Sequence, residues 1–289
     1  MSAMGLGLWQ LISQTTSHTT SSINYRTVQI VFVSQQKTGD TTVINTGIIM
    51  NNGDHIIGNT AYNITPIGTG IIVNNDGYVI TAGHLIDAGQ QYIQQSQSEI
   101  KKLGIIIVGP SAGVAPLYQL TNDFDVIGRD EKHDLALLKI KMTQSMTPEG
   151  DMESFVHYIY GIDGTLDVGD APFTTNVSQN SRIAITGYTS AQLTLETKDG
   201  KVTSAQIPDI NNSLISVVTG NVTYNFTDYY QTDITANSIF SGSPVYSTSN
   251  GTIMGICNCA SQDEFDNSGT VDIIPSKYIL ALLKSNNIK

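Results

Sequence analysis

Short apolar runs recur along most of this chain, separated by polar stretches rich in Asn, Gly and Asp. Such runs, bounded by turn residues, predict β-strands. Two runs in residues 68–81 flank a turn in which Asp76 and Gly77 suit positive φ, so a hairpin is expected there. Further strands are predicted at residues 28–34, 103–108, 125–127, 135–140, 182–186, 191–197, 202–207, 214–218, 229–232, 243–246 and 252–258.

The pattern changes at three places along the chain. Residues 1–25 are rich in Ser and Thr after a short apolar start, which predicts an N-terminal arm. Residues 146–172 are polar and punctuated by Gly, which predicts a connection between a lobe at 26–145 and a lobe at 173–289. Residues 276–284 carry apolar residues at helical spacing behind Ser276, a candidate cap, so a C-terminal helix is expected. Many short strands and one helix predict an all-β fold of two packed antiparallel barrels.

Composition excludes some functions. The net charge is −11, with no basic cluster, which argues against a nucleic-acid partner. The apolar segment near the N-terminus is too short to span a bilayer, and no basic residue precedes it as in a signal peptide. Cys257 and Cys259 lie two residues apart on one predicted strand, where a bridge needs unusual geometry, so two reduced thiols are expected. An intracellular or virion-associated location is therefore favoured over secretion.

Three short segments carry the candidate chemistry: residues 81–84 (TAGH), 133–138 (HDLALL) and 240–244 (FSGSP). Each lies at the edge of a predicted strand. Ser241 is a candidate nucleophile, His84 a candidate base and Asp134 the acid that orients the imidazole. Alone, each also fits a structural role: a strand-end histidine, a solvated acid or a turn serine. Asp125 and Asp130 compete with Asp134, but neither precedes an equally apolar strand.

The remaining histidines show no metal-ligand spacing, so no metal and no cofactor are expected.

These segments resemble trypsin-like serine peptidases, and the motif pattern is most similar to the Deg/HtrA-like protease domain. Residues 68–84 resemble the strands that enter the family's catalytic histidine, 133–140 its aspartate strand and 231–244 its nucleophile loop. The similarity covers roughly residues 26–286, and no PDZ domain is expected after it. The resemblance implies two six-stranded β-barrels with an active site between them and a terminal helix. It also implies a serine endopeptidase that cleaves protein or peptide substrates through an acyl-enzyme.

The resemblance implies roles for particular residues. His84, Asp134 and Ser241 are the expected triad, and the backbone N–H groups of Ile239 and Ser241 the expected oxyanion hole. The family's substrate pocket corresponds to four uncharged residues, from which a neutral pocket for a small or medium side chain is expected. They are Thr235, Asn258, Cys259 and Ala260.

One position departs from the family pattern. The residue two before the serine is usually glycine, but here it is Ile239, followed by Phe240. A β-branched residue resists positive φ, so two interpretations stay open. The loop reaches a competent geometry only when substrate or a partner binds, or the hole is collapsed and the triad is slow. The alternative function is a catalytically weak or inactive structural component of a larger assembly, such as a virus particle, in which a partner holds the arm.

Overall fold

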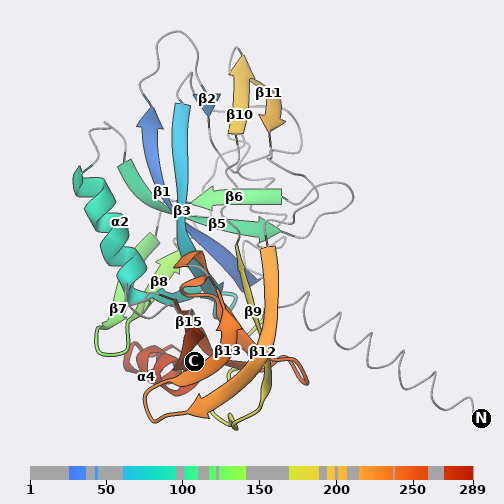
Figure 1. Cartoon of the computed structure of the whole chain (residues 1–289). Coiled ribbons are helices and arrows are strands. Elements are labelled where there is room, and N and C mark those ends of the chain that lie inside the picture. The colour runs from blue at the N-terminus through green and yellow to red at the C-terminus, as the bar shows by residue number, and fades with distance from the viewer. Residues whose placement is uncertain are drawn as a thin grey trace, which may run out of the picture.

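Two β-lobes make up the computed structural model of this chain (Figure 1). The structure describes residues 26–36, 43–44, 61–95, 101–109, 117–121, 124–140, 169–188, 194–198, 201–206, 215–236, 238–259 and 270–288. The predicted arm at 1–25 and most of the predicted connection at 146–172 lie outside these ranges, so the domain boundaries stay predictions.

The first lobe is a seven-stranded sheet in the order β6-β5-β1-β3-β4-β8-β7. Its strands are β1 (Thr27–Gln36), β3 (Ala61–Ile72), β4 (Tyr78–Ala82), β5 (Lys101–Gly109), β6 (Leu117–Thr121), β7 (Phe124–Asp130) and β8 (Leu135–Ile140). All neighbouring strands are antiparallel. The hairpin predicted in residues 68–81 is confirmed as β3–β4, closed by a hydrogen bond from the Val73 N–H to the Tyr78 carbonyl (2.7 Å) and by Gly77 at φ 82°.

A helix that the strand pattern did not predict follows β4 directly. This helix, α2 (Gly83–Gln95), begins one residue before His84. Leu85 and Ile86 of this helix are buried in the core of the first lobe, in one cluster with Val28 and Ile30 of β1. The helix therefore covers one face of the sheet and places His84 in its own first turn.

The second lobe is a closed barrel of six strands in the order β12-β13-β16-β15-β14-β9. These strands are β9 (Arg182–Tyr188), β12 (Ile215–Asn225), β13 (Tyr230–Thr235), β14 (Pro244–Ser247), β15 (Ile253–Asn258) and β16 (Thr270–Pro275). Away from the barrel, β2 (Val43–Ile44), β10 (Thr194–Lys198) and β11 (Lys201–Gln206) form a small sheet in the order β11-β10-β2. The predicted all-β, two-lobed fold is confirmed, although the first lobe pairs seven strands.

A shared apolar core joins the lobes. Ile71 and Leu137 of the first lobe pack in one cluster with Ile256 of the barrel and with Ile279 and Leu282 of the terminal helix. Burial of an aliphatic side chain contributes about 1.5–3 kcal/mol, so this cluster fixes the two lobes against each other. The loops at the lobe junction are therefore held at fixed positions relative to one another.

The predicted C-terminal helix is confirmed as α4 (Ser276–Ser285), but its cap is not the one expected. Pro275 occupies the N-cap position without a side-chain cap hydrogen bond. Ser276 is the first helical residue, and its buried hydroxyl donates to the Ile253 carbonyl on β15 (2.8 Å). The Ser276 hydroxyl therefore bonds to a neighbouring strand and does not cap the helix, as the sequence pattern predicted it would. In the described part of the chain, no helix has the length and apolar character needed to cross a membrane.

Candidate active site

His84 and Asp134 meet because their strands are neighbours. In the β4–β8 pair Ala82 lies opposite Leu135, so residues just after β4 reach residues just before β8. Asp134 Oδ2 accepts from His84 Nδ1 at 2.6 Å, and Oδ1 accepts from the His84 backbone N–H at 2.7 Å. The Gly83 N–H also donates to the Asp134 carbonyl (2.8 Å). The carboxylate thus fixes both the position of the imidazole and the nitrogen that carries its proton.

The turn that carries Asp134 is stabilised by contacts with the terminal helix. Asp134 itself has a positive φ of 52°. Asp130, which competed with it in the sequence, accepts instead from the His133 backbone N–H (3.2 Å) and from His133 Nδ1 (2.7 Å). The His133 ring stacks on Tyr278 of α4, with ring centroids 3.5 Å apart. The terminal helix therefore supports the strained turn that carries the acid.

Tyr278 is held in turn by the loop between β12 and β13. Its hydroxyl donates to Asp228 Oδ1 at 2.5 Å. This hydrogen bond raises the pKa of Tyr278 to about 12, and the same bond lowers the pKa of Asp228. At neutral pH the phenol therefore stays protonated and the carboxylate ionised, which is the pair of states the bond requires.

Ser241 lies in a turn clasped between the lobes. It follows the 3-10 turn η1 (Ser238–Phe240) and precedes β14. The Ser241 carbonyl accepts from the Thr69 N–H of β3 (2.9 Å), and the Gly242 N–H donates to the Cys257 carbonyl of β15 (2.8 Å). Gly242 has φ 81°, and a Cβ on it would lie 2.0 Å from the Thr69 carbonyl oxygen, so only glycine fits.

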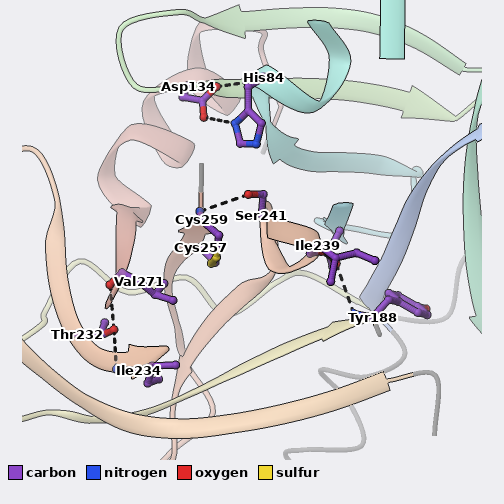
Figure 2. Close-up of a disulfide and its surroundings, with 11 residues drawn as sticks. His84, Asp134, Tyr188, Thr232, Ile234, Ile239, Ser241, Cys257, Cys259 and Val271 are labelled. Carbon is purple, nitrogen blue, oxygen red and sulfur yellow. Dashed lines mark hydrogen bonds and ion pairs between the residues drawn. A yellow bond between two sulfur atoms is a disulfide. The ribbon is translucent and has the colours of Figure 1, made fainter. Parts of the chain in front are cut away.

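The hydroxyl of Ser241 is buried below the imidazole. Figure 2 shows Ser241 on the side of the His84 ring opposite Asp134, with the cysteine pair beyond it. Its Oγ accepts a hydrogen bond from the Cys259 backbone N–H at 3.3 Å. The three candidate catalytic residues are thus brought to one place, and in this structure the serine hydroxyl is held from the side of β15.

The segment before Ser241 is packed against the core of the barrel. The side chains of Ile239 and Phe240 pack into the barrel core, and the Ile239 carbonyl accepts from Thr69 Oγ1 (3.1 Å). Ile239 does not take a left-handed φ, in line with its β-branched side chain. In a 3-10 turn each N–H is directed to the carbonyl three residues earlier, which for Ser241 is that of Ser238. The Ser241 amide is therefore directed into the turn.

Cys257 and Cys259 form a disulfide, which corrects the expectation of two reduced thiols. Side chains two residues apart share a face of a strand, and β15 ends at Asn258, between the two cysteines. Their Cα atoms are 6.0 Å apart, within the range that a disulfide spans and less than the ~6.6 Å of a fully extended pair. The end of the strand brings the two sulfur atoms within bonding reach.

The predicted pocket residues are only partly described. Thr235 is exposed at the end of β13, Asn258 is half-buried at the end of β15, and Cys259 is buried. Ala260 lies outside the described residues. The three described positions carry no charged side chain, but their assembly into a substrate pocket stays a prediction.

Thr69 is the site residue that sequence reasoning missed. It is fully buried on β3, and it contacts the turn at Ser241 through both its N–H and its hydroxyl. Its carbonyl accepts from Thr81 Oγ1 at 2.6 Å, which ties it to β4 as well. A threonine in a strand carries no local signal of such a role, because its partners come from the other lobe.

Comparisons with known proteins agree with this fold. The family described as "Trypsin-like peptidase domain" matches residues 68–256. A solved structure, "HtrA-type protease AlgW with decapeptide", matches with a TM-score of 0.52 at 14% sequence identity, over 93% of this chain and 66% of that chain. The present chain thus spans slightly less than two thirds of that protein, and an identity this low indicates a shared fold only. A search of the curated proteins finds no match.

Proposed function

Because this chain belongs to the family of trypsin-like peptidase domains, we propose that it is a serine endopeptidase with Ser241 as nucleophile, His84 as general base and Asp134 as orienting acid. The observation that carries the proposal is the doubly hydrogen-bonded His84–Asp134 pair facing a buried serine across the lobe junction (Figure 2). The Asp130–His133 pair makes the same two kinds of hydrogen bond but stacks on Tyr278, so the buried serine that faces His84 is what distinguishes the proposed catalytic pair.

The chemistry follows from the proton positions. Ser241 Oγ attacks the carbonyl carbon of the scissile peptide while His84 Nε2 takes the hydroxyl proton, and Asp134 stabilises the imidazolium through Nδ1. The imidazolium then gives this proton to the leaving amine, and an acyl-enzyme ester on Ser241 remains. Water attacks the ester with His84 again as base, which releases the acid product and restores the serine hydroxyl.

The resting form of this site differs from a competent one in two ways. Ser241 Oγ is engaged by the Cys259 amide, and the 3-10 turn directs the Ser241 amide toward Ser238. An oxyanion hole needs the amides of Ile239 and Ser241 aimed at one point, and losing one such donor costs roughly 10²–10³ in rate. We therefore propose that activity is conditional: bound substrate or a partner turns the peptide before Ile239 and opens the hole.

The substrate is proposed to be a protein or peptide with a neutral side chain before the scissile bond. The uncharged character of Thr235, Asn258 and Cys259 supports this, because an Arg or Lys preference needs a carboxylate in the pocket. The solved relative carries a decapeptide in its description, which agrees with a peptide-binding junction. Cleavage of a peptide library concentrated after Arg or Lys would contradict the proposed pocket.

A fluorophosphonate probe tests the proposed nucleophile. Wild type is expected to be labelled slowly and Ser241→Ala not at all. Ile239→Gly removes the resistance to a left-handed φ and is expected to raise the labelling rate by about two orders of magnitude. Ile239→Ala is the matched control, because it loses the same apolar side chain but keeps a Cβ, and a smaller gain is expected.

The rival function is a structural component of an assembly that keeps the fold without the activity. The buried Ile239 and the closed turn are the observations that favour it. Absence of labelling in both wild type and folded Ile239→Gly would contradict the enzymatic function and favour this structural one. The expected partner of residues 1–25 stays a prediction in either case.

A further inference from the structure

All of the thiol chemistry of this chain is concentrated beside the candidate nucleophile. The sequence contains two cysteines, and the structure joins them in the Cys257–Cys259 disulfide. Cys257 is fully buried and Cys259 is 6% exposed, at the end of β15 that borders the Ser241 turn (Figure 2). The proposed catalytic steps make no use of this bridge.

Three hydrogen bonds connect the cysteine segment to the nucleophile turn. Two of them are made by the Cys257 backbone: its carbonyl accepts from the Gly242 N–H and its N–H donates to the Ser243 carbonyl, both at 2.8 Å. They extend the pairing of β14 with β15 beyond the start of β14, and they do not involve the sulfur atoms. The third runs from the Cys259 N–H to Ser241 Oγ at 3.3 Å, beyond the end of the strand.

The third bond depends on where the disulfide holds the backbone of Cys259. The bridge keeps the two Cα atoms 6.0 Å apart, whereas two residues of relaxed strand span about 6.6 Å. A donor–acceptor distance of 3.3 Å is already at the long end for N–H···O hydrogen bonds. A further separation of a few tenths of an ångström would take this donor and acceptor beyond hydrogen-bond range.

We propose that Cys257–Cys259 is a thiol–disulfide exchange site that positions the nucleophile. With the bridge closed, the Cys259 amide holds Ser241 Oγ. With the bridge reduced, the end of β15 extends and the hydroxyl is released toward His84. This inference rests on the proposed serine peptidase function, which it deepens.

The reacting partner is a dithiol reductant. One of its thiolates attacks Sγ of Cys259, the less deeply buried of the two residues, and the Cys257 thiolate leaves and is protonated. The second thiol of the reductant then attacks the mixed disulfide and releases the Cys259 thiolate, which also takes a proton. Two electrons and two protons pass to the protein, and the reductant leaves as its own disulfide.

The first test counts thiols in the full chain. Protein purified without reductant is denatured, alkylated with iodoacetamide and weighed by mass spectrometry, with and without prior dithiothreitol. No adduct before reduction and two after it are expected, and the count is unambiguous because the chain has no other cysteine. Two adducts without reductant would overturn the proposal.

The second test measures what the bridge does to the nucleophile. Fluorophosphonate labelling is expected to be roughly fivefold to tenfold faster after reduction, the effect of releasing about one hydrogen bond. In the double variant Cys257→Ser/Cys259→Ser, which cannot form the bridge, dithiothreitol is expected to leave the labelling rate unchanged. Equal rates for oxidised and reduced wild type would overturn the positioning role.

Hydrogen exchange at the Cys259 amide separates this inference from the proposed function. Exchange is expected to speed up on reduction in wild type and to be unaffected by dithiothreitol in the double variant. If no probe labels either redox state, the proposed function fails, and the amide still decides the inference. Unchanged exchange on reduction overturns it, whereas faster exchange supports it.

Discussion

Gly242→Ala is the substitution for which the structure makes the sharpest prediction. Gly242 has φ 81°, and an added Cβ would lie 2.0 Å from the Thr69 carbonyl oxygen and 2.6 Å from Thr81 Oγ1. The carbonyl oxygen is main chain in a buried strand and has no rotamer by which to withdraw. The methyl group therefore forces the Ser241 turn away from the first lobe.

Two costs add up at this position. A left-handed φ costs a residue with a Cβ about 1–2 kcal/mol. Relief of the overlap also strains or breaks the buried hydrogen bonds that Thr69 makes to Ser241 and Thr81, and an unsatisfied buried group costs about 1–3 kcal/mol. We expect the free energy of unfolding to fall by about 4 kcal/mol, with loss of fluorophosphonate labelling.

Gly169→Ala is the matched control. Gly169 also has a positive φ, 65°, but the nearest atom to its added Cβ is Nη2 of Arg26 at 3.8 Å. It therefore carries the conformational cost without the overlap, and a loss of about 1 kcal/mol is expected. Urea denaturation of both variants measures the difference. If Gly242→Ala loses no more stability than Gly169→Ala, the proposed clasp between the turn and β3 is wrong.

Two further predictions concern the acid and its brace. Asp134→Asn presents an amide where the His84 Nδ1–H needs an acceptor, so kcat is expected to fall about 10³–10⁴-fold with little change in KM, and an unchanged kcat in steady-state assays would exclude this role. Tyr278→Phe keeps a ring to stack on His133 but removes the hydrogen bond to Asp228. In wild type, the raised pKa of Tyr278 means that this bond stabilises the fold below about pH 10, and that the stabilisation is lost as pH rises through about 12. The lowered pKa of Asp228 means that the stabilisation from its carboxylate is lost at acidic pH. Unfolding midpoints across pH should therefore show a smaller alkaline loss in Tyr278→Phe than in wild type, and identical alkaline limbs would contradict the assignment.

Elements with a strong local pattern were the ones that sequence reasoning predicted. The β3–β4 hairpin has apolar runs on both sides of a turn that requires Gly77, and β8 is almost continuously apolar because both of its faces are buried. The helix α2 was missed because its segment contains two glycines, Gly83 and Gly89, which lower helix propensity. Leu103 packs where a Cβ on Gly89 would lie, so contact with β5 gives that glycine a packing reason that its own segment does not reveal.

The same division applies to the candidate site. His84, Asp134 and Ser241 could be proposed from the sequence because each lies at the edge of a strand with its own sequence signature. Details that depend on a distant partner were not predicted: the Ser276 hydroxyl bonds to β15 rather than capping α4, and the disulfide follows from where β15 ends. Hydrophobic periodicity records which face of a strand is buried, but it does not record which distant backbone group a polar side chain will reach.

Ile239 is where local propensity and tertiary packing act together. Its β-branched side chain disfavours the left-handed φ, and the barrel core buries it together with Phe240, which stabilises the 3-10 turn by a further few kcal/mol. Opening the proposed oxyanion hole would then draw on binding energy from substrate or a partner, which is the physical meaning of the proposed conditional activity. The same reasoning separates stability from rate: Ile239→Gly should unfold more easily than wild type and yet react faster. A mutation that merely damaged the fold would lower both, so the opposite signs are what a resting turn held closed by its own core packing requires.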